Sequence, residues 1–402
     1  MPDAELHEPR ECFDSWSELI VEATRFRREL HAAPELTWQE HETARRVRER
    51  LDAAGISWRA CAETGTVAEL AESASGPRIA LRGDLDALPI HEQGESEWRS
   101  QSEGCMHACG HDGHTAALLA SAWWLKQHED ALPGPVRLLF QPAEEGGHGA
   151  RAMIKGGALE GVDAVYGWHN WPAIPFGKAV CPDGTVMAAN GTFKITVEGL
   201  GGHASQPELC RDPVFAGAAI ITALQQLVAR RLPPQAANVV AVTWFKAESA
   251  DTVTPQSATL GGSIRLADNR FREQVTELIT EIAGSTAQAS GCEATVEHSP
   301  RYDATVNDAK AAETMRGALA EVLGEDWLSR ETAVPIMASE DFSEYQKRVP
   351  GAFALIGADD GPEHRVACHN ARYDFNDALL PRVVALYARL AGAPPPELDG
   401  DG

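Results

Sequence analysis

RIALRGDLDALP, residues 78–89, predicts a buried β-strand that runs into an acidic loop. VRLLFQPAEE (136–145) has the same apolar character and ends on two glutamates, and VDAVYGWHNW (162–171) ends on a histidine. HTAALLASAWWLKQHED (114–130) and ELTWQEHETARRVRERLDAAG (35–55) predict helices, the second ending at a glycine cap. Polar residues at the carboxyl ends of strands that alternate with helices are typical of α/β proteins, which bind ligands at that edge of a parallel sheet.

The pattern changes near residue 190. Six further elements follow in the order βαββαβ, over residues 191–200, 212–231, 238–248, 257–267, 269–290 and 293–300. This order is that of a ferredoxin-like domain. The α/β pattern returns from about residue 303 and closes with the helix pattern LLPRVVALYARLAG. We therefore expect one α/β domain, residues 1–188 and 303–402, interrupted by a ferredoxin-like domain at 189–302.

The composition limits the partners of the protein. A chain of 402 residues, 44% of them hydrophobic, is long enough for two domains with real cores. Its 59 acidic and 35 basic residues give a formal charge of -24, which repels nucleic acid and anionic membranes, so we expect neither as a partner. Seven of the basic residues are lysines, a bias that fits either a protein of a high-salt organism or a GC-rich genome that favours arginine.

We expect a soluble, cytoplasmic protein. The opening residues MPDAELHEPRECFDSW are polar and acidic rather than basic and then apolar as in a signal peptide. The apolar run AALLASAWWL, at 116–125, is shorter than the ~20 residues of a membrane span. The eight cysteines follow no spacing framework and are expected to be thiols.

The stretch MHACGHDGH (106–114) collects potential metal ligands before the helix pattern. Cys109 and His111 are two residues apart, so a loop can direct both at one ion such as Zn²⁺. His107 and His114 could be ligands or could orient ligands. The alternative is a polar helix start, with Asp112 near the cap.

Three other segments place ligand types at predicted strand ends or near the C-terminus. Glu144 and Glu145 follow the strand VRLLF and precede two glycines, so a tight turn could let one bind metal while the other acts as a base. His169 ends another strand, and His369 lies in CHNARYDFND (368–377). A lone histidine or glutamate pair is usually structural, but four such segments together favour a metal site.

The sequence resembles the amidohydrolase branch of the di-metal aminoacylase and carboxypeptidase family, which includes hippurate hydrolases, indole-acetyl-amino-acid hydrolases and N-acetyldiaminopimelate deacetylases. The matching stretches cover nearly the whole chain in the family's order: RRELHAAPELTWQE, RGDLDALPI, MHACGHDGHTA, FQPAEEGGHGA, GWHNWP, GLGGHASQP, TPQSATLGGSIR, ASEDFS and HNARYDFND. No single stretch is specific, but the combination is. The resemblance implies a di-metal peptidase-like α/β catalytic domain whose inserted ferredoxin-like lid also forms a dimer interface.

The resemblance also implies roles for individual residues. The metal ligands would be Cys109, His111, Glu145, His169 and His369. Cys109 would bridge two ions where other branches use aspartate, Glu144 would be the general base, and His203 of the lid would hydrogen-bond the substrate carbonyl. The site would hold two divalent metal ions. Zn²⁺ and Mn²⁺ are the main candidates, because the soft cysteine ligand favours zinc whereas the carboxylate ligand suits manganese. Co²⁺ and Ni²⁺ are further candidates.

A second group of residues is expected to contact the substrate or to hydrogen-bond the metal ligands. Asp86 could hydrogen-bond a ligand histidine or could be a surface loop acid. Thr252, Arg265 and Glu340 are placed near the substrate or the ligands. Thr252 stands where family members commonly carry the asparagine of N-V-I-P, a departure that leaves the chemistry in place and puts the substrate in doubt.

The favoured function is a metal-dependent amidohydrolase that removes an N-acyl group, with acetyl favoured, from an amino acid or diamino acid. Its partners would be a small-molecule N-acyl amino acid and a second copy of the chain. The alternative within the family is a dipeptidase or aminopeptidase. A hydrolase with Cys109 as nucleophile is an alternative of another class, but it leaves Glu144, Glu145 and His169 without a role. A non-catalytic metal-binding scaffold would not need a base beside its ligand.

Overall fold

The computed structural model describes residues 13–398 and divides into two compact units. The α/β unit contains the chain up to Gly184, Val306–Ala333 and the chain from Glu344 onward. The inserted unit contains Thr185–Thr305 and also Val334–Ser343. This last segment falls in the range expected for the α/β domain, but its backbone binds the inserted unit, since the Ala188 N–H donates to the Ala338 carbonyl (2.9 Å). It has no strand or helix periodicity that could have assigned it.

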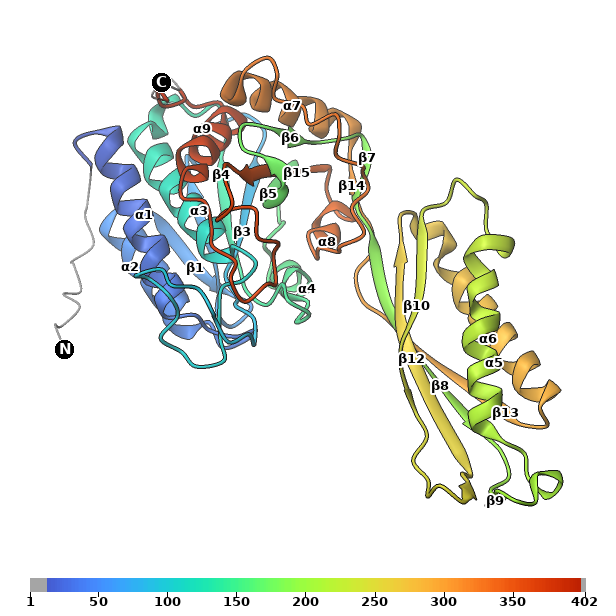
Figure 1. The fold of residues 1–402 in the computed structure, drawn as a ribbon. Helices are drawn as coiled ribbons and strands as arrows, with labels where there is room; N and C mark the ends of the chain where they lie inside the picture. The colour runs from blue at the N-terminus through green and yellow to red at the C-terminus, as the bar shows by residue number, and fades with distance from the viewer. Residues whose placement is uncertain (1–12, 399–402) are drawn as a thin grey trace. The chain divides into compact units, whose positions relative to one another are not determined.

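A seven-stranded sheet forms the centre of the α/β unit (Figure 1). Its strands, in spatial order, are β1 (Ser57–Cys61), β2 (Gly65–Leu70), β4 (Val136–Gln141), β3 (Ile79–Asp84), β5 (Ala164–Pro175), β15 (Gly351–Asp359) and β6 (Ala179–Val180). The four middle strands β4, β3, β5 and β15 are parallel. The parallel α/β sheet predicted from the apolar runs is therefore present, and β4, β3 and β5 carry the sequence motifs at their carboxyl ends.

Helices cover this sheet, and three of them, α1, α3 and α9, pack against one another. The helical segments of the unit are α1 (Trp16–Ala32), α2 (His41–Ala53), α3 (His111–Gln127), η1 (Glu129–Ala131), α4 (Gly149–Lys155), α7 (Ala309–Leu323), α8 (Ser343–Gln346) and α9 (Leu379–Ala391). Helix α3 is buried over most of its length because its sequence is apolar on nearly every side. Its first residue, His111, lies beside the sheet edge where β3 ends.

The inserted unit has the predicted βαββαβ order. Its elements are β8 (Ala189–Glu198), α5 (Pro213–Gln226), β10 (Asn238–Lys246), β12 (Ser257–Leu266), α6 (Arg272–Ala289) and β13 (Glu293–Pro300). The four strands pair antiparallel in the order β10-β12-β8-β13. Its shorter elements are β7 (Gly184–Met187), β9 (Gly202–His203), η2 (Pro207–Leu209), η3 (Leu227–Arg231), β11 (Val253–Thr254) and η4 (Asn269–Phe271), and β14 (Thr305–Asn307) follows where the chain returns to the α/β unit.

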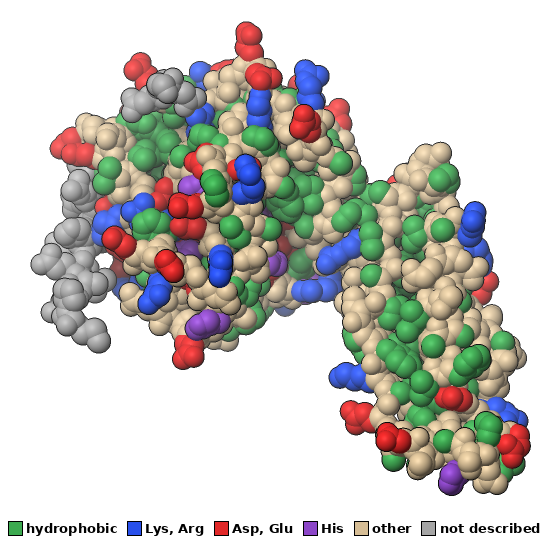
Figure 2. Space-filling model, viewed as in Figure 1, with side chains coloured by type: hydrophobic (Ala, Val, Ile, Leu, Met, Phe, Trp, Pro, Cys, Tyr) green, Lys and Arg blue, Asp and Glu red, His purple; other side chains and the backbone are tan. Residues whose placement is uncertain are grey.

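One helical segment, Pro213–Arg231, has the length and composition that could cross a membrane. Ala216, Ile220 and Leu224 on this segment are buried in the core of the inserted unit. Such a buried stripe is what a helix in a folded domain requires. Hydrophobic side chains are also visible on the surface of this unit (Figure 2). Its exposed large hydrophobic residues are Leu200, Leu209, Phe215, Val239, Trp244, Val253 and Val334.

Candidate active site

The turn before α3 places Cys109 and His111. Gly110 between them has φ +94°, a conformation that glycine adopts readily and other residues rarely. A Cβ atom at this position would lie 2.4 Å from Asn170 Oδ1 and 2.6 Å from Tyr373 Oη. Glycine is thus required both for the backbone conformation and for the close packing of the turn.

The rings of His111 and His169 are oriented so that their Nε2 atoms are available as metal ligands. His111 Nδ1 donates to the Asp86 carbonyl (2.8 Å), and His169 Nδ1 donates to the Asn170 carbonyl (2.7 Å). In each neutral ring the other nitrogen then carries the lone pair. His169 Nε2 lies 3.3 Å from Cys109 Sγ. Burial and the nearby His114 hold the pKa of His169 well below its usual value, which keeps the ring in the neutral form that binds metals.

Asp86 shapes the turn that carries the two glutamates after β4. Its carboxylate accepts the backbone N–H of Glu144 (2.9 Å) and of Glu145 (3.0 Å), and it also accepts the Thr37 hydroxyl (2.8 Å). Burial would raise the pKa of Asp86, but its hydrogen bonds with His111, Glu145 and Thr37 lower it, so the carboxylate stays ionised. Its Oδ1 atom also lies 3.4 Å from His111 Nδ1. Asp86 therefore supports both a histidine and the glutamate pair.

His369 reaches the same region from the C-terminal part of the chain. Its backbone has φ +67°, and its N–H donates to the Ala108 carbonyl (2.7 Å). This bond fixes the segment beside the turn that holds Cys109. His369 Nε2 lies 3.1 Å from Glu145 Oε1. The chain thus brings together residues that are more than two hundred positions apart in the sequence.

Two sets of ligand atoms meet at Cys109. One is formed by Cys109, His111 and His169, and the other by Cys109, Glu145 and His369, with the ligand atoms of each set within 4.8 Å of one another. A third set joins His111 with Glu144 and Glu145. A thiolate shared by the first two sets is the arrangement that a pair of bridged cations would need. All five ligands expected from the sequence are therefore close together, and Glu144 is adjacent.

The local chemistry fits bound cations. His111 Nε2 is buried without a hydrogen-bond partner among the described residues. Burial alone would lower the pKa of His111, but Asp84, Asp86 and Glu145 raise it to about 10. The carboxylates thus hold a positive charge at this position, which a divalent ion could supply in place of the proton. A cation would likewise stabilise the Cys109 thiolate, whose pKa is raised by the hydrogen bond with Cys368, by burial and by Glu145.

A buried chain of polar residues lies behind the ligands, and the sequence analysis named only His114 of this chain as a residue that could orient them. Asp84 at the end of β3 binds His114 Nδ1 (2.6 Å), and His114 Nε2 binds Asn170 Oδ1 (2.7 Å). Asn170 Nδ2 in turn donates to the Tyr373 hydroxyl (2.7 Å). Asn170 directly follows the ligand His169, so this chain fixes the strand end that carries the ligand. Its sequence signal was the presence of Asp84 and His114 in the motifs around Asp86 and His111.

A second buried network surrounds Asp112 in the first turn of α3. Asp112 Oδ2 binds His31 Nδ1 (2.8 Å) and lies 3.5 Å from Arg27 Nη1. Arg27 also forms an ion pair with Asp377 (2.7 Å). The expected helix-cap position of Asp112 is close to what is seen, but its side chain binds α1 rather than its own helix. The neighbouring His107 is buried, which lowers its pKa to about 4 and keeps the ring neutral.

Four expected site residues lie in the inserted unit. His203 ends β9 and is exposed, and its Nδ1 accepts the Ser205 N–H (3.1 Å). Thr252 is exposed beside β11, and its carbonyl accepts the Ala204 N–H (2.9 Å). Arg265 on β12 is half-buried and donates to the Ser339 hydroxyl (3.2 Å).

Burial lowers the pKa of Arg265, and the positive charge of the neighbouring Arg301 lowers it further. Glu340 is buried, and its carboxylate accepts the Phe342 N–H (3.1 Å). His203, Thr252, Arg265 and Glu340 therefore all belong to the inserted unit, whereas the five expected metal ligands belong to the α/β unit.

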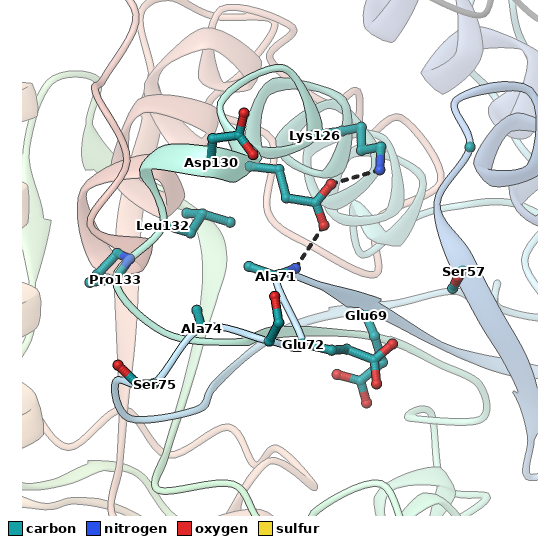
Figure 3. Close-up of a pocket in the computed structure, with 13 residues that line it drawn as sticks. Ser57, Glu69, Ala71, Glu72, Ala74, Ser75, Lys126, Asp130, Leu132 and Pro133 are labelled. Atoms are coloured by element: carbon teal, nitrogen blue, oxygen red, sulfur yellow. Dashed lines mark hydrogen bonds and ion pairs between the residues drawn. The ribbon is translucent and has the colours of Figure 1, made fainter.

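A surface cavity of about 670 Å³ elsewhere on the α/β unit is lined by acidic groups (Figure 3). Glu129 there already accepts Lys126 Nζ (2.6 Å) and the Ala71 N–H (2.7 Å). Glu69 is paired with Arg78 and Arg137. None of the predicted site residues lines the cavity.

The fold and this cluster define a metal-dependent hydrolase of the α/β class. A family profile described as Peptidase family M20/M25/M40 matches residues 80–393. The chain belongs to this family, and it is an amide-bond hydrolase of the amidohydrolase branch.

Curated relatives match almost from end to end. An IAA-amino acid hydrolase ILR1-like 5 of Arabidopsis thaliana is 38% identical over 95% of this chain and 87% of its own length. A hippurate hydrolase of Campylobacter jejuni is 37% identical over 93% of this chain and 97% of its own length. An N-acetyl-L-cysteine deacetylase of Bacillus subtilis is 39% identical over 83% of this chain and 79% of its own length.

A solved structure shares both the fold and the sequence. The Bacillus subtilis YXEP protein, described as a dinuclear metal-binding peptidase of the M20 family, has a TM-score of 0.81 and 32% identity. The match covers 94% of this chain and 98% of that one. The similarity therefore extends over both units of the chain.

Proposed function

We propose that this protein hydrolyses the amide bond of an N-acyl amino acid or diamino acid, with acetyl as the favoured acyl group. The observation that supports this most directly is the sharing of Cys109 by two ligand sets beside Glu144. The named relatives act on indole-acetyl, benzoyl and acetyl derivatives of amino acids, as their names state. They share the amide of an N-acyl amino acid and differ in the acyl group.

Divalent ions held by the five ligands would lower the pKa of water to about 7 and polarise the amide carbonyl. Glu144 is the base in this proposal, because it lies beside His111 and Glu145 but belongs to neither of the two ligand sets that share Cys109. Its carboxylate takes a proton from the attacking water and passes it to the leaving amine. The Asp86 carboxylate holds the backbone of both glutamates and so keeps Glu144 and Glu145 in their separate positions.

His203 is the proposed donor to the substrate oxygen. Because His203 Nδ1 accepts the Ser205 N–H, the proton of a neutral ring resides on Nε2. Nε2 can therefore donate a hydrogen bond to the oxygen on which negative charge develops. Arg265 is the proposed partner of the substrate carboxylate, since a guanidinium binds such a group through two parallel hydrogen bonds. Catalysis in this proposal requires the inserted unit to act as a lid.

The proposal is tested with N-acetyl, N-benzoyl and dipeptide substrates. Metal-free enzyme is assayed after addition of Zn²⁺, Mn²⁺ or Co²⁺, each in separate reactions. We expect activity only with added metal and the highest kcat/KM on N-acetyl amino acids. Preference for dipeptides would favour the peptidase alternative, which has support in a thermostable carboxypeptidase of Saccharolobus solfataricus that is 33% identical.

The same experiment tests the cysteine-nucleophile alternative. Cys109 and His169 are close enough for such a pair, with 3.3 Å between Sγ and Nε2. A cysteine hydrolase would keep its activity in EDTA and would need no added ion. Full activity of the metal-free enzyme would therefore contradict the proposal.

A further inference from the structure

A second thiol lies against the shared ligand Cys109. Cys368 Sγ is 3.9 Å from the Cys109 carbonyl oxygen and accepts a weak hydrogen bond from Asn170 Nδ2 (3.8 Å). The Cys368 thiol also raises the pKa of the Cys109 thiol, as expected of a neighbouring sulfur group. Cys368 is half-buried, whereas Cys109 is 7% exposed. One thiol of the pair is therefore accessible from solvent and the other is the expected bridging ligand.

A backbone hydrogen bond joins the two segments that carry the cysteines. The His369 N–H donates to the Ala108 carbonyl (2.7 Å). Cys109 directly follows Ala108, and Cys368 directly precedes His369. Disulfides bridge Cα atoms about 4.4–6.8 Å apart. The 3.9 Å between Cys368 Sγ and the Cys109 carbonyl oxygen brings the Cys368 thiol next to Cys109, and the proposed bond requires the two Cα atoms to lie within this range.

We propose that Cys109 and Cys368 form a reversible disulfide under peroxide, and that this bond switches the metal centre off. Hydrogen peroxide first oxidises the more exposed Cys368 thiol to a sulfenic acid, with cleavage of the O–O bond and release of one water. The Cys109 sulfur then attacks the Cys368 sulfur. The S–O bond breaks, and the departing hydroxide takes the thiol proton and leaves as a second water. Two thiols and one peroxide thus give one disulfide and two waters.

The disulfide would remove the ligand that both metal sets share. A disulfide sulfur has no negative charge and is a much poorer ligand than a thiolate. Glu145 and His369 would then lack the third member of their set, and so would His111 and His169. Bound metal should protect Cys109, so oxidation is expected to be faster in metal-free protein. The loss of metal rests on the proposed function, but the disulfide itself does not.

The test uses the full chain in metal-loaded and metal-free forms, treated with hydrogen peroxide. Free thiols are titrated under denaturing conditions, tryptic peptides are mapped without reduction, and bound metal is measured after gel filtration. We expect two of the eight thiols to be lost, with a link between the peptide of residues 100–126 and that of residues 366–372. Because Cys105 shares the first peptide with Cys109, the mapping is repeated in C105S. Reduction followed by addition of metal should restore the metal content and the activity.

C368S is the decisive variant, and C61S is its control, because Cys61 is a buried thiol whose contacts are with Met153 and Gly156. C368S should keep its metal and activity in peroxide at concentrations that inactivate both C61S and the unsubstituted protein.

Peroxide that gives only sulfinic acid at Cys368, or a link to Cys105, would overturn the proposal. A Cys109–Cys368 link that forms while the metal stays bound would refute the switch and also the assignment of Cys109 as the shared ligand. If the Cys109–Cys368 link forms in peroxide but the untreated, metal-loaded protein hydrolyses no amide, the proposed function is contradicted and the disulfide is not.

Discussion

Glu144 and Glu145 are neighbours in the sequence but have different surroundings after the turn that follows β4. Both lie near His111, but Glu145 also contacts His369 and shares a ligand set with Cys109, whereas Glu144 is the more buried of the two. E144Q should therefore retain metal and lose turnover by about 10²–10⁴-fold, the usual contribution of a positioned base. E145Q should lose metal as well as activity. The measurement is metal content by mass spectrometry together with kcat for both variants.

The substitution of one carboxylate by its amide makes the two variants a matched pair, since size and hydrogen-bonding shape are preserved. Equal metal content and equal loss of kcat in E144Q and E145Q would void the division of roles. Metal loss in E144Q alone would reverse it.

His31 provides a pH-dependent contribution to stability. Burial would lower the pKa of His31, but Asp112 and Glu92 raise it from 6.5 to about 9. A raised histidine pKa stabilises the fold fully below pH 6.5, and this stabilisation is lost as the pH rises through about 9. We expect the free energy of unfolding to fall by about 3 kcal/mol across this window because of this residue.

H31N is the suitable reference variant, because its side-chain amide can still donate to Asp112 but does not titrate. Urea unfolding between pH 6 and pH 10 is compared for the two proteins. The difference in unfolding free energy between them should shrink as the pH rises. A difference that is constant with pH would show that His31 does not carry the charge assigned to it.

At the scale of elements, the strong apolar runs were sufficient to predict β3, β4 and β5, and periodicity predicted the six main elements of the inserted unit. Helix α1 was not predicted, because its buried face includes the charged or polar residues Arg27 and His31 as well as leucines. The hairpin of β1 and β2 was also missed, since the exposed residues of β1 give it no apolar pattern. Residues buried by pairing with distant partners do not show hydrophobic periodicity.

The same reasoning separates the parts of the site that could be predicted from those that could not. Glu144, Glu145 and His169 follow predicted strands, and the carboxyl ends of parallel strands meet at one edge of a sheet. The expectation that Cys109, His111 and His369 join them rested on the family resemblance. The chain of Asp84, His114 and Asn170 to Tyr373 depends on contacts between four different segments. No local pattern specifies such contacts. The closeness of Cys368 to Cys109 was hidden for the same reason.

The turn before α3 can be tested as an element. G110A should destabilise the protein by about 1–3 kcal/mol, because the added Cβ meets Asn170 and Tyr373 in a well-packed region. It should also weaken metal binding, since the turn positions both Cys109 and His111. Thermal unfolding and metal content are the measurements.

G104A is the control for the backbone effect. Gly104 has φ +73°, and a Cβ there would meet nothing within 4 Å. Both variants therefore carry the cost of a positive φ, but only G110A adds a steric contact. Equal effects of the two substitutions on metal content would mean that the packing around Gly110 does not support the site.

At the scale of the whole molecule, we propose that two chains associate through the inserted unit, whose exposed large hydrophobic residues are available for such a contact. Contiguous apolar surface on a soluble protein commonly marks an interaction site. His203 is on the same unit and is exposed in the single chain. A dimer formed through this unit could therefore let His203 of one subunit serve the metal centre of the other. H203A should keep the metals and the fold and lose kcat by about 10²–10³-fold.

Subunit mixing decides between action across the dimer and action within one chain. H203A and E144Q each have strongly reduced activity alone, and they are mixed and allowed to exchange subunits. If His203 acts across a two-fold dimer, each mixed dimer has one site with both Glu144 and His203 intact, and random exchange should restore roughly a quarter of the normal activity. Exchange is verified by co-purification of an untagged subunit with a tagged one, and each variant exchanged with itself is the control. Verified mixed dimers without any recovery would mean that His203 serves its own chain, since in that case every site in the mixed dimer lacks one of the two groups.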